Sequence, residues 1–228
     1  MLGFSWIDYL ALGFFLAAWL GYHTAVELLP AGRGSLNARM NLYREVWMEQ
    51  LLLRENRIVD TTVMASLQNG TAFFASTSLF AIGGVLALFQ GTDVALTLFG
   101  DLPFGVATTR LGFEAKAGGL AIIFVYSFFK FAWSYRLFNY AAILLGAIPV
   151  DRDHPQAGIA ARRAAAMTIV AGRHFNRGQR AFFFATAYLG WFVSAYVMAA
   201  ATAAVLFVMW RRQFASDATA ALEPESTR

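Results

Sequence analysis

The chain has 228 residues, of which 58% are hydrophobic and 14% are charged, and its formal net charge at pH 7 is +4. This balance is typical of an integral membrane protein and excludes an ordinary soluble domain of this length. The absence of cysteine excludes disulfides, thiolate metal sites and cysteine nucleophiles.

Four apolar segments are predicted to cross a membrane, at about residues 4–26, 62–90, 117–148 and 181–210. Each exceeds the ~20 residues that span a bilayer core. Small residues recur at every fourth position of the first segment, which suits close helix packing within the chain or between copies. These residues are Gly13, Ala17, Gly21 and Ala25.

The segments between the spans are also predicted to contain helices. Residues 36–60 place Leu42, Val46 and Leu53 near helical spacing, with charged residues between them. Residues 151–155 form a turn, and an alanine-rich run that ends near Gly172 follows. The predicted fold is all-α: four transmembrane helices and two amphipathic cytoplasmic helices in residues 1–212, then a polar tail, 213–228, predicted to be disordered.

Basic residues set the expected orientation. The first connecting segment carries five arginines and the third carries six, against five Lys and Arg residues in the second connection and the tail. The expected location is the inner (cytoplasmic) membrane, where the positive-inside rule places the first and third connections in the cytoplasm and both termini in the periplasm or exterior. Arg211 and Arg212, directly after the fourth segment, oppose this arrangement.

Two cations interrupt the third apolar segment. At 1.5 Å per residue, Lys130 lies about 18 Å from Gly118 at one end, and Arg136 lies about 18 Å from Ile148 at the other. Residues 118–148 contain no acidic residue. Such cations usually face a bundle interior or a watery path. Helical spacing puts Ser134 on the face of Lys130, and Asn139 on the face of Arg136. The two cations therefore point in different directions.

Three roles are open for these cations: structural pairing with other residues, snorkelling of the long side chain toward the membrane interface, or lining of an anion path. Glu55 or Asp60 is the expected partner of one cation. Gln68 and Asn69 in the second segment can either hold helices together or line a path.

A third polar cluster precedes the fourth segment. It contains Arg173, Arg177 and Arg180, which are predicted to contact the phosphates of anionic lipids at the inner leaflet. Metal or haem ligation by His23 and His174 is disfavoured, because no carboxylate motif adjoins them. Common enzyme signatures are absent, and no cofactor is expected.

Four fragments resemble a bacterial and plant membrane family known as domain of unknown function 599. They are RENRIVD, QNGTAFFAST, KFAWSYRLFNYAAILLGAIP and GRHFNRGQRAFFFATAYLGWF, and the similarity covers about residues 5–212. The resemblance implies a four-span membrane protein and carries no catalytic or binding residue.

The first functional hypothesis is an oligomeric, channel-like or transport protein that passes a small anion or binds anionic lipid. The alternative is an accessory or scaffold subunit of a larger membrane complex. The expected partners are the bilayer, anionic head groups, and further copies or other subunits, with no nucleic acid.

Overall fold

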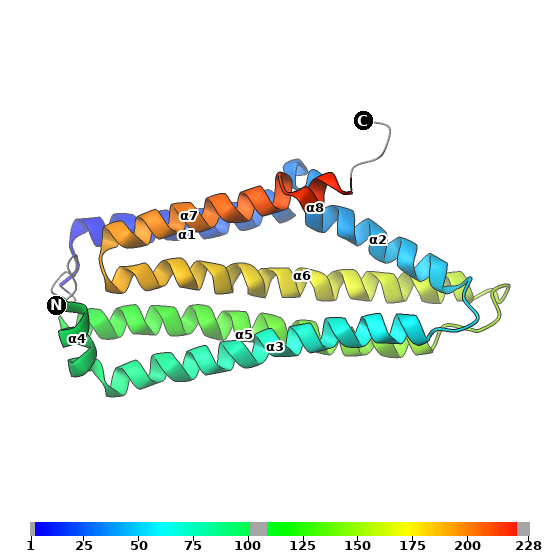
Figure 1. Cartoon of the computed structure of the whole chain (residues 1–228), viewed down its shortest axis with the longest axis horizontal. Coiled ribbons are helices and arrows are strands. Elements are labelled where there is room, and N and C mark those ends of the chain that lie inside the picture. The colour runs from blue at the N-terminus through cyan, green and yellow to red at the C-terminus, as the bar shows by residue number, and fades with distance from the viewer. Residues whose placement is uncertain (1–2, 101–108, 223–228) are drawn as a thin grey trace.

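The computed structural model describes residues 3–100 and 109–222, which form a bundle of helices (Figure 1). In chain order these are α1 (Trp6–Glu27), η1 (Pro30–Gly34), α2 (Leu36–Leu51), α3 (Ile58–Gln90), α4 (Thr92–Gly100), α5 (Arg110–Gly146), α6 (Ala157–Leu189), η2 (Gly190–Phe192), α7 (Ala195–Phe214) and α8 (Asp217–Ala220). By length and composition, four helical segments can cross a membrane: Trp6–Glu27, Ile58–Gln90, Arg110–Gly146 and Ala195–Ala220. The all-α prediction is confirmed.

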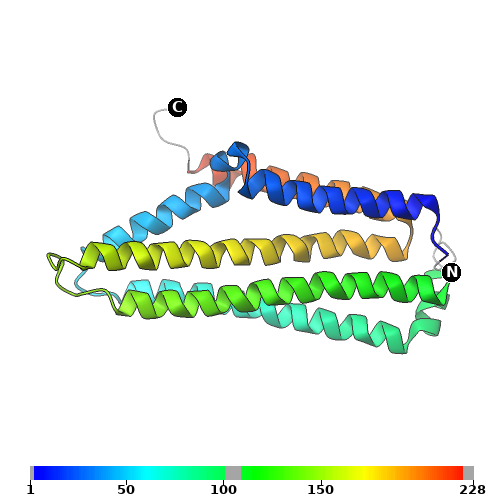
Figure 2. The same cartoon turned by 180° about the vertical axis from the view of Figure 1, so that it is seen from behind.

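Three long helices form the body of the bundle. α5 packs against both α3 and α6 along their lengths. α1 and α7 lie side by side over one half of α6, and α2 crosses its other half (Figures 1 and 2). The three long helices therefore extend well beyond the ends of α1 and α7.

Hydroxyl side chains cap the N-termini of several of these helices. Ser5 caps α1 in a capping box with Asp8, and Thr109 caps α5 by accepting from the amide of Gly112 at 3.1 Å. Ser194 accepts from the amide of Val197 at 3.2 Å and begins α7. Each cap satisfies an amide that has no partner within the helix.

The predicted fourth span, 181–210, is wrong as a single helix. Its first residues complete α6, which ends at Leu189, and the chain then reverses through η2 into α7. The Ser194 cap starts a new helix here, and a Cβ on Gly190 would lie only 3.0 Å from the backbone of Met198. An apolar run with no charge gives no signal for this tight reversal.

The reversal also corrects the extent of the alanine-rich helix. That helix does not end near Gly172 but continues to Leu189. α7 runs in the same direction as α1, so the start of α1 and the end of α7 lie at opposite ends of their shared half (Figure 1). The expectation that both termini lie on one side of a membrane stays a prediction.

One half of the bundle contains a layer without charged residues. Asp8 and Lys116 mark one end of this charge-free layer, and Glu27, Lys130 and Arg180 mark the other. Its segments, 9–26, 74–90, 117–129, 181–189 and 195–210, contain no Asp, Glu, Lys or Arg. From Asp8 to Glu27 on α1 the layer is about 28 Å deep at 1.5 Å per residue, and from Lys116 to Lys130 on α5 it is about 21 Å deep.

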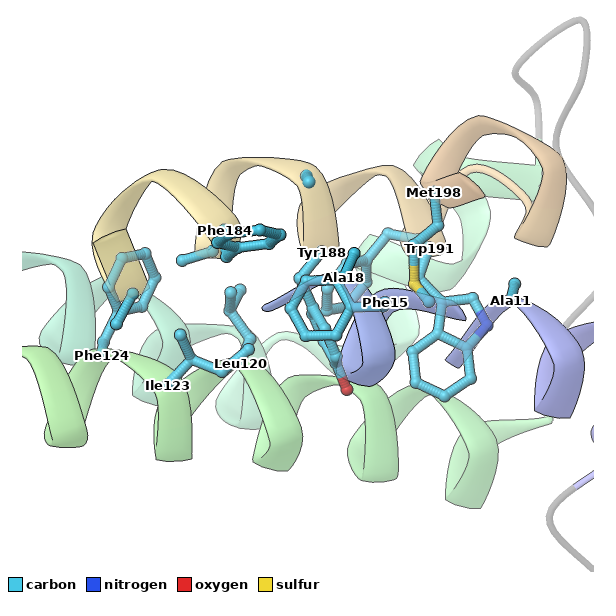
Figure 3. Packing of buried hydrophobic residues seen from close by; sticks show 14 of the residues in the cluster. Ala11, Phe15, Ala18, Leu120, Ile123, Phe124, Phe184, Tyr188, Trp191 and Met198 are labelled. Atoms are coloured by element: carbon cyan, nitrogen blue, oxygen red, sulfur yellow. The ribbon is translucent and has the colours of Figure 1, made fainter. Parts of the chain in front are cut away.

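Aromatic and small side chains fill the interior of this layer (Figure 3). The ring of Phe15 on α1 contacts Phe184 and Tyr188 of α6, with centroids 5.8 and 5.4 Å apart. Leu120 and Ile123 of α5 lie in the same cluster. A second cluster, formed by α2, α3, α5 and α6, packs the half that extends beyond the layer.

The apolar positions of α2 and the glycines of α1 do not make the packing contacts expected from the sequence. On α2 the predicted apolar positions, including Leu42 and Val46, are exposed, whereas Met48 and Leu51 are buried against the bundle. On α1 a Cβ added at Gly21 would meet no atom within 4 Å, and the same holds at Gly13. Close packing within the chain therefore does not explain these two glycines.

We expect Gly190→Ala to destabilise the protein, because the added methyl group meets the backbone of Met198 rather than a movable side chain. Overpacking of this kind costs about 1–3 kcal/mol. Thermal unfolding in detergent should show a lower Tm for Gly190→Ala. Gly21→Ala, which adds the same atom in open space within α1, is the matched control and should not lower the Tm. Equal Tm values for both variants would contradict the tight reversal.

Candidate functional site

The side chain of Glu27, in the last turn of α1, connects α1 to α6. Arg177 donates to Oε2 of Glu27 from Nε at 2.8 Å and from Nη2 at 2.5 Å, and Arg180 pairs with Oε1. His23 Nδ1 lies 3.5 Å from Oε1, one turn earlier on α1. The side chains of Glu27 and Arg180 are only 11% and 6% exposed. Buried, hydrogen-bonded ion pairs of this kind fix the positions of both helices.

Positive charge exceeds negative charge around Glu27. Lys130 of α5 lies about level with His23, one turn before Glu27, because it is one turn after Tyr126 of α5, which contacts Trp19 of α1. The Nζ atom of Lys130 lies 5.1 Å from the ring centroid of Tyr126, a cation–π contact. Among the described residues, no carboxylate lies within ion-pair distance of Lys130. A single carboxylate thus faces several cations.

His174 of α6 lies beside this cationic region. Its ring faces that of Trp133 with centroids 6.5 Å apart, and its Nδ1 is buried with no hydrogen-bond partner among the described residues. Burial, and then the charges of Lys130 and Arg177, lower the pKa of His174. The imidazole is therefore neutral near pH 7 and adds no charge to the region.

A cavity of about 500 Å³ opens beside the Glu27 pairs. The end of α1, η1 and the start of α2 form one wall, and α6 forms the other. Its polar lining consists of Glu27, Ser35, Asn37, Asn41, Arg173, Asn176, Arg177 and Arg180. Arg173 is exposed, and no described carboxylate lies within ion-pair distance of it. The cavity therefore offers guanidinium and amide donors that an anion can use.

Arg44 packs across α6 next to this cavity. Its guanidinium donates to Oδ1 of Asn41 at 2.7 Å, and burial lowers its pKa. A Cβ on Gly172 would lie 2.7 Å from Arg44 Nη2, so the missing side chain makes room for the guanidinium. Gly172, predicted as the end of a helix, instead provides close contact between α2 and α6.

The other predicted polar residues are distributed over the bundle. Gln68 donates to Asn139 at 2.6 Å and joins α3 to α5, and Ser134 donates to the carbonyl of Ala171 at 2.8 Å and joins α5 to α6. Asn69 is exposed. These contacts match the use of polar groups as links between helices.

Lys130 and Arg136 do not form one site. Their helical spacing predicts this, because it points the two side chains in different directions. Arg136 is exposed, and its Nε donates to the hydroxyl of Tyr140 on the same helix at 2.6 Å. It lies about 9 Å farther than Lys130 from the charge-free layer. Neither cation lies in the middle of that layer, because α5 has 37 residues and extends well beyond it.

The expected carboxylate partners lie elsewhere. Asp60 is buried at the start of α3, where it pairs with Arg54 and accepts from Trp47 Nε1 at 2.7 Å. Glu55 is exposed. The structure therefore pairs Asp60 with a residue of its own connecting segment rather than with Lys130 or Arg136.

Glu27 is the residue that the sequence analysis missed. Its signal was available: it is the first acidic residue after Asp8 and ends an apolar run, with His23 four positions before it. The described residues contain no group of three or more His, Asp or Glu side chains that could hold a metal ion. The cluster of arginines, by contrast, has the chemistry of an anion site.

The fold and this cluster define a helical protein with four segments able to cross a membrane and a cationic cavity at the end of its charge-free layer. A family model described as "Protein of unknown function, DUF599" matches residues 10–218. The chain therefore belongs to the DUF599 family, as the four sequence fragments indicated. No curated protein and no solved structure matches the chain.

We expect Glu27→Gln to destabilise the protein by about 3 kcal/mol, because it leaves the buried Arg180 without its counter-charge. Chemical unfolding in detergent can measure this loss. Glu114→Gln removes the carboxylate of an exposed pair with Arg110 and is the matched control, and it should unfold close to the wild type. A loss for Glu27→Gln no larger than that of the control would contradict the role assigned to Glu27.

Proposed function

We propose that this protein spans a membrane with its charge-free layer and binds the anionic head group of a lipid in the cavity beside Glu27. The observation that carries the proposal is the position of Arg173, Arg177 and Arg180, which line one cavity at one end of that layer. Lipid phosphates lie at this depth, just outside the hydrocarbon core.

The dimensions of the layer support this placement. The depth of about 28 Å along α1 agrees with a hydrocarbon core of about 30 Å, whereas α5 is free of charge over about 21 Å. The exposed side chains of this half include Phe80 on α3, Ile122 on α5 and Phe207 on α7, which are suited to lipid. The C-terminal end of α6 enters the layer beside α1, α3, α5 and α7.

The distribution of cations supports an orientation. Among the lysines and arginines that the structure describes, only Arg110 and Lys116 lie at the end of the layer where α1 begins. The rest lie at the Glu27 end or beyond it, which the positive-inside rule assigns to the cytoplasm. The N-terminus is then outside and the C-terminus inside. Arg211 and Arg212 now follow the rule instead of opposing it.

An anion path through one copy of the chain has less support. The interior of the charge-free layer is occupied by the apolar cluster around Phe15, Phe184 and Tyr188 (Figure 3). The cationic residues lie at its edge and do not continue into it. Lipid binding at the edge needs no passage through this packed interior.

An accessory subunit is the second candidate function, and an exposed apolar surface favours it. Ile58, Val59 and Val63 of α3 and Ile143 of α5 are exposed outside the charge-free layer, where lipid cannot cover them. A second copy of the chain or another membrane protein is suited to this surface.

The head-group proposal predicts that Arg173→Gln weakens binding of phosphatidylglycerol by roughly fivefold, because one cation near anionic lipid contributes about 1 kcal/mol. Titration of fluorescent phosphatidylglycerol into purified protein measures the change. Arg136→Gln removes an exposed cation of α5 outside the cavity and should bind like the wild type. Equal affinities for the wild type and both variants would overturn the proposed site.

The orientation predicts which engineered cysteines are labelled from each side of the membrane. The native chain has no cysteine, so Asp93→Cys, Arg162→Cys and Asp217→Cys each introduce a single exposed thiol. Positions 162 and 217 should react only from the cytoplasmic side, and position 93 only from outside. Labelling of positions 217 and 93 from the same side would show that the C-terminus is misplaced.

A further inference from the structure

The head-group cavity continues into a second cavity along the line where α2 crosses α6. This second cavity also has a volume of about 500 Å³, and Arg173 lines both. On α2 the lining passes from Asn41 to Glu45, one helical turn farther from the layer. The two cavities therefore adjoin at Arg173, and together they are called the α2–α6 groove.

The chemistry of the groove changes at Arg173. Toward the layer, three arginines face the single carboxylate of Glu27. Away from it, the lining is mainly apolar and small: Met48, Leu52, Ala161, Ala165, Ile169 and Val170. We call this second part the distal groove.

The charged residues of the distal groove are Glu45 and Glu49 on the α2 wall and Arg162 on the α6 wall, with Arg173 at the junction with the head-group cavity. The distal groove therefore has no excess of positive charge, whereas the cavity near the layer is cationic. The whole groove is thus suited to an anion that carries an uncharged apolar chain.

The size of the distal groove selects among apolar occupants. From Arg173 to Gly158 it extends over 15 residues of α6, or about 22 Å. A lipid chain that fills half of a 30 Å bilayer core needs about 15 Å. A helix about 10 Å wide and 22 Å long would occupy roughly 1,700 Å³, which is more than the distal groove contains. A hydrocarbon chain fits, and a helix does not.

Lipid that stays within the bilayer cannot fill the distal groove, because the groove lies beyond the charge-free layer. We propose that the α2–α6 groove binds an amphiphile with one hydrocarbon chain, its anionic group at Arg173 and its chain along Met48, Ala165 and Ile169. This inference rests on the proposed head-group site and names the class of ligand that the site takes. It would allow the protein to hold a single-chain anion outside the membrane.

Ala166 offers a way to block the distal groove. It lines the groove but is exposed, so a larger side chain there needs no space in the buried core. Ala166→Trp should occupy the groove and leave the head-group cavity open. Val46→Trp places the same side chain at an exposed position of α2 outside the groove and is the matched control.

The experiment measures binding of hexyl, octyl and decyl phosphate to the full chain in nanodiscs, with subtraction of binding to empty nanodiscs. For the wild type and Val46→Trp, affinity should rise up to about fourfold with each methylene that enters the groove. For Ala166→Trp this dependence on chain length should be lost, and decyl phosphate should bind at least tenfold more weakly. Phosphatidylglycerol binding by Ala166→Trp should equal that of the wild type.

Two outcomes separate this inference from the head-group proposal. If Ala166→Trp, with a wild-type Tm, binds decyl phosphate as tightly as Val46→Trp does, the chain does not lie in the distal groove, and the head-group site is unaffected. If Arg173→Gln binds both decyl phosphate and phosphatidylglycerol like the wild type, the head-group site itself is overturned. Weaker binding of both probes by Arg173→Gln, together with a loss by Ala166→Trp for decyl phosphate alone, supports the inference.

Discussion

The ion pairs between Glu27 and the two arginines of α6 are the contact on which the rest of the site depends. They join the last turn of α1 to the middle of α6 at the depth where the charge-free layer ends. A carboxylate and two guanidinium groups held away from water are stable only as a hydrogen-bonded set. This requirement fixes the level of α1 along α6, and the position of η1 and α2 follows from it because they continue directly from α1.

The cationic cavity is a consequence of this arrangement. Glu27 compensates part of the charge of Arg177 and Arg180, and no described carboxylate lies within ion-pair distance of Arg173, one turn away. The polar ends of α1 and α2 then face the same stretch of α6, which combines donors from elements far apart in the sequence. Farther out, small residues of α6 such as Ala161 and Ala165 leave space beneath α2. One crossing of two helices therefore provides both the cationic and the apolar part of the groove.

Much of the fold could be predicted from the sequence because membrane-spanning helices have a strong local signal. The first three apolar segments correspond to α1, α3 and α5, although the ends of α3 and α5 differ from the predicted limits. The arginines at 173, 177 and 180 were placed correctly just before an apolar run. The prediction of the fourth segment as one helix failed, because the chain turns between Gly190 and Ser194 and no charge or proline marks this turn. The sequence also did not identify the carboxylate that pairs with these arginines, since Glu27 lies 150 residues away from Arg177 in the chain.

Composition and periodicity by themselves determined that the protein is helical, apolar enough to enter a membrane and basic at the borders of its apolar segments. These properties depend on single residues and their near neighbours, so the order of the amino acids is sufficient to show them. The tertiary structure alone decided that α6 and α7 are separate helices, that Lys130 lies at the end of the charge-free layer, and that Asp60 pairs with Arg54. Those outcomes depend on which helices meet and at what depth, and that is set by long-range packing and by the cost of leaving buried charges unpaired.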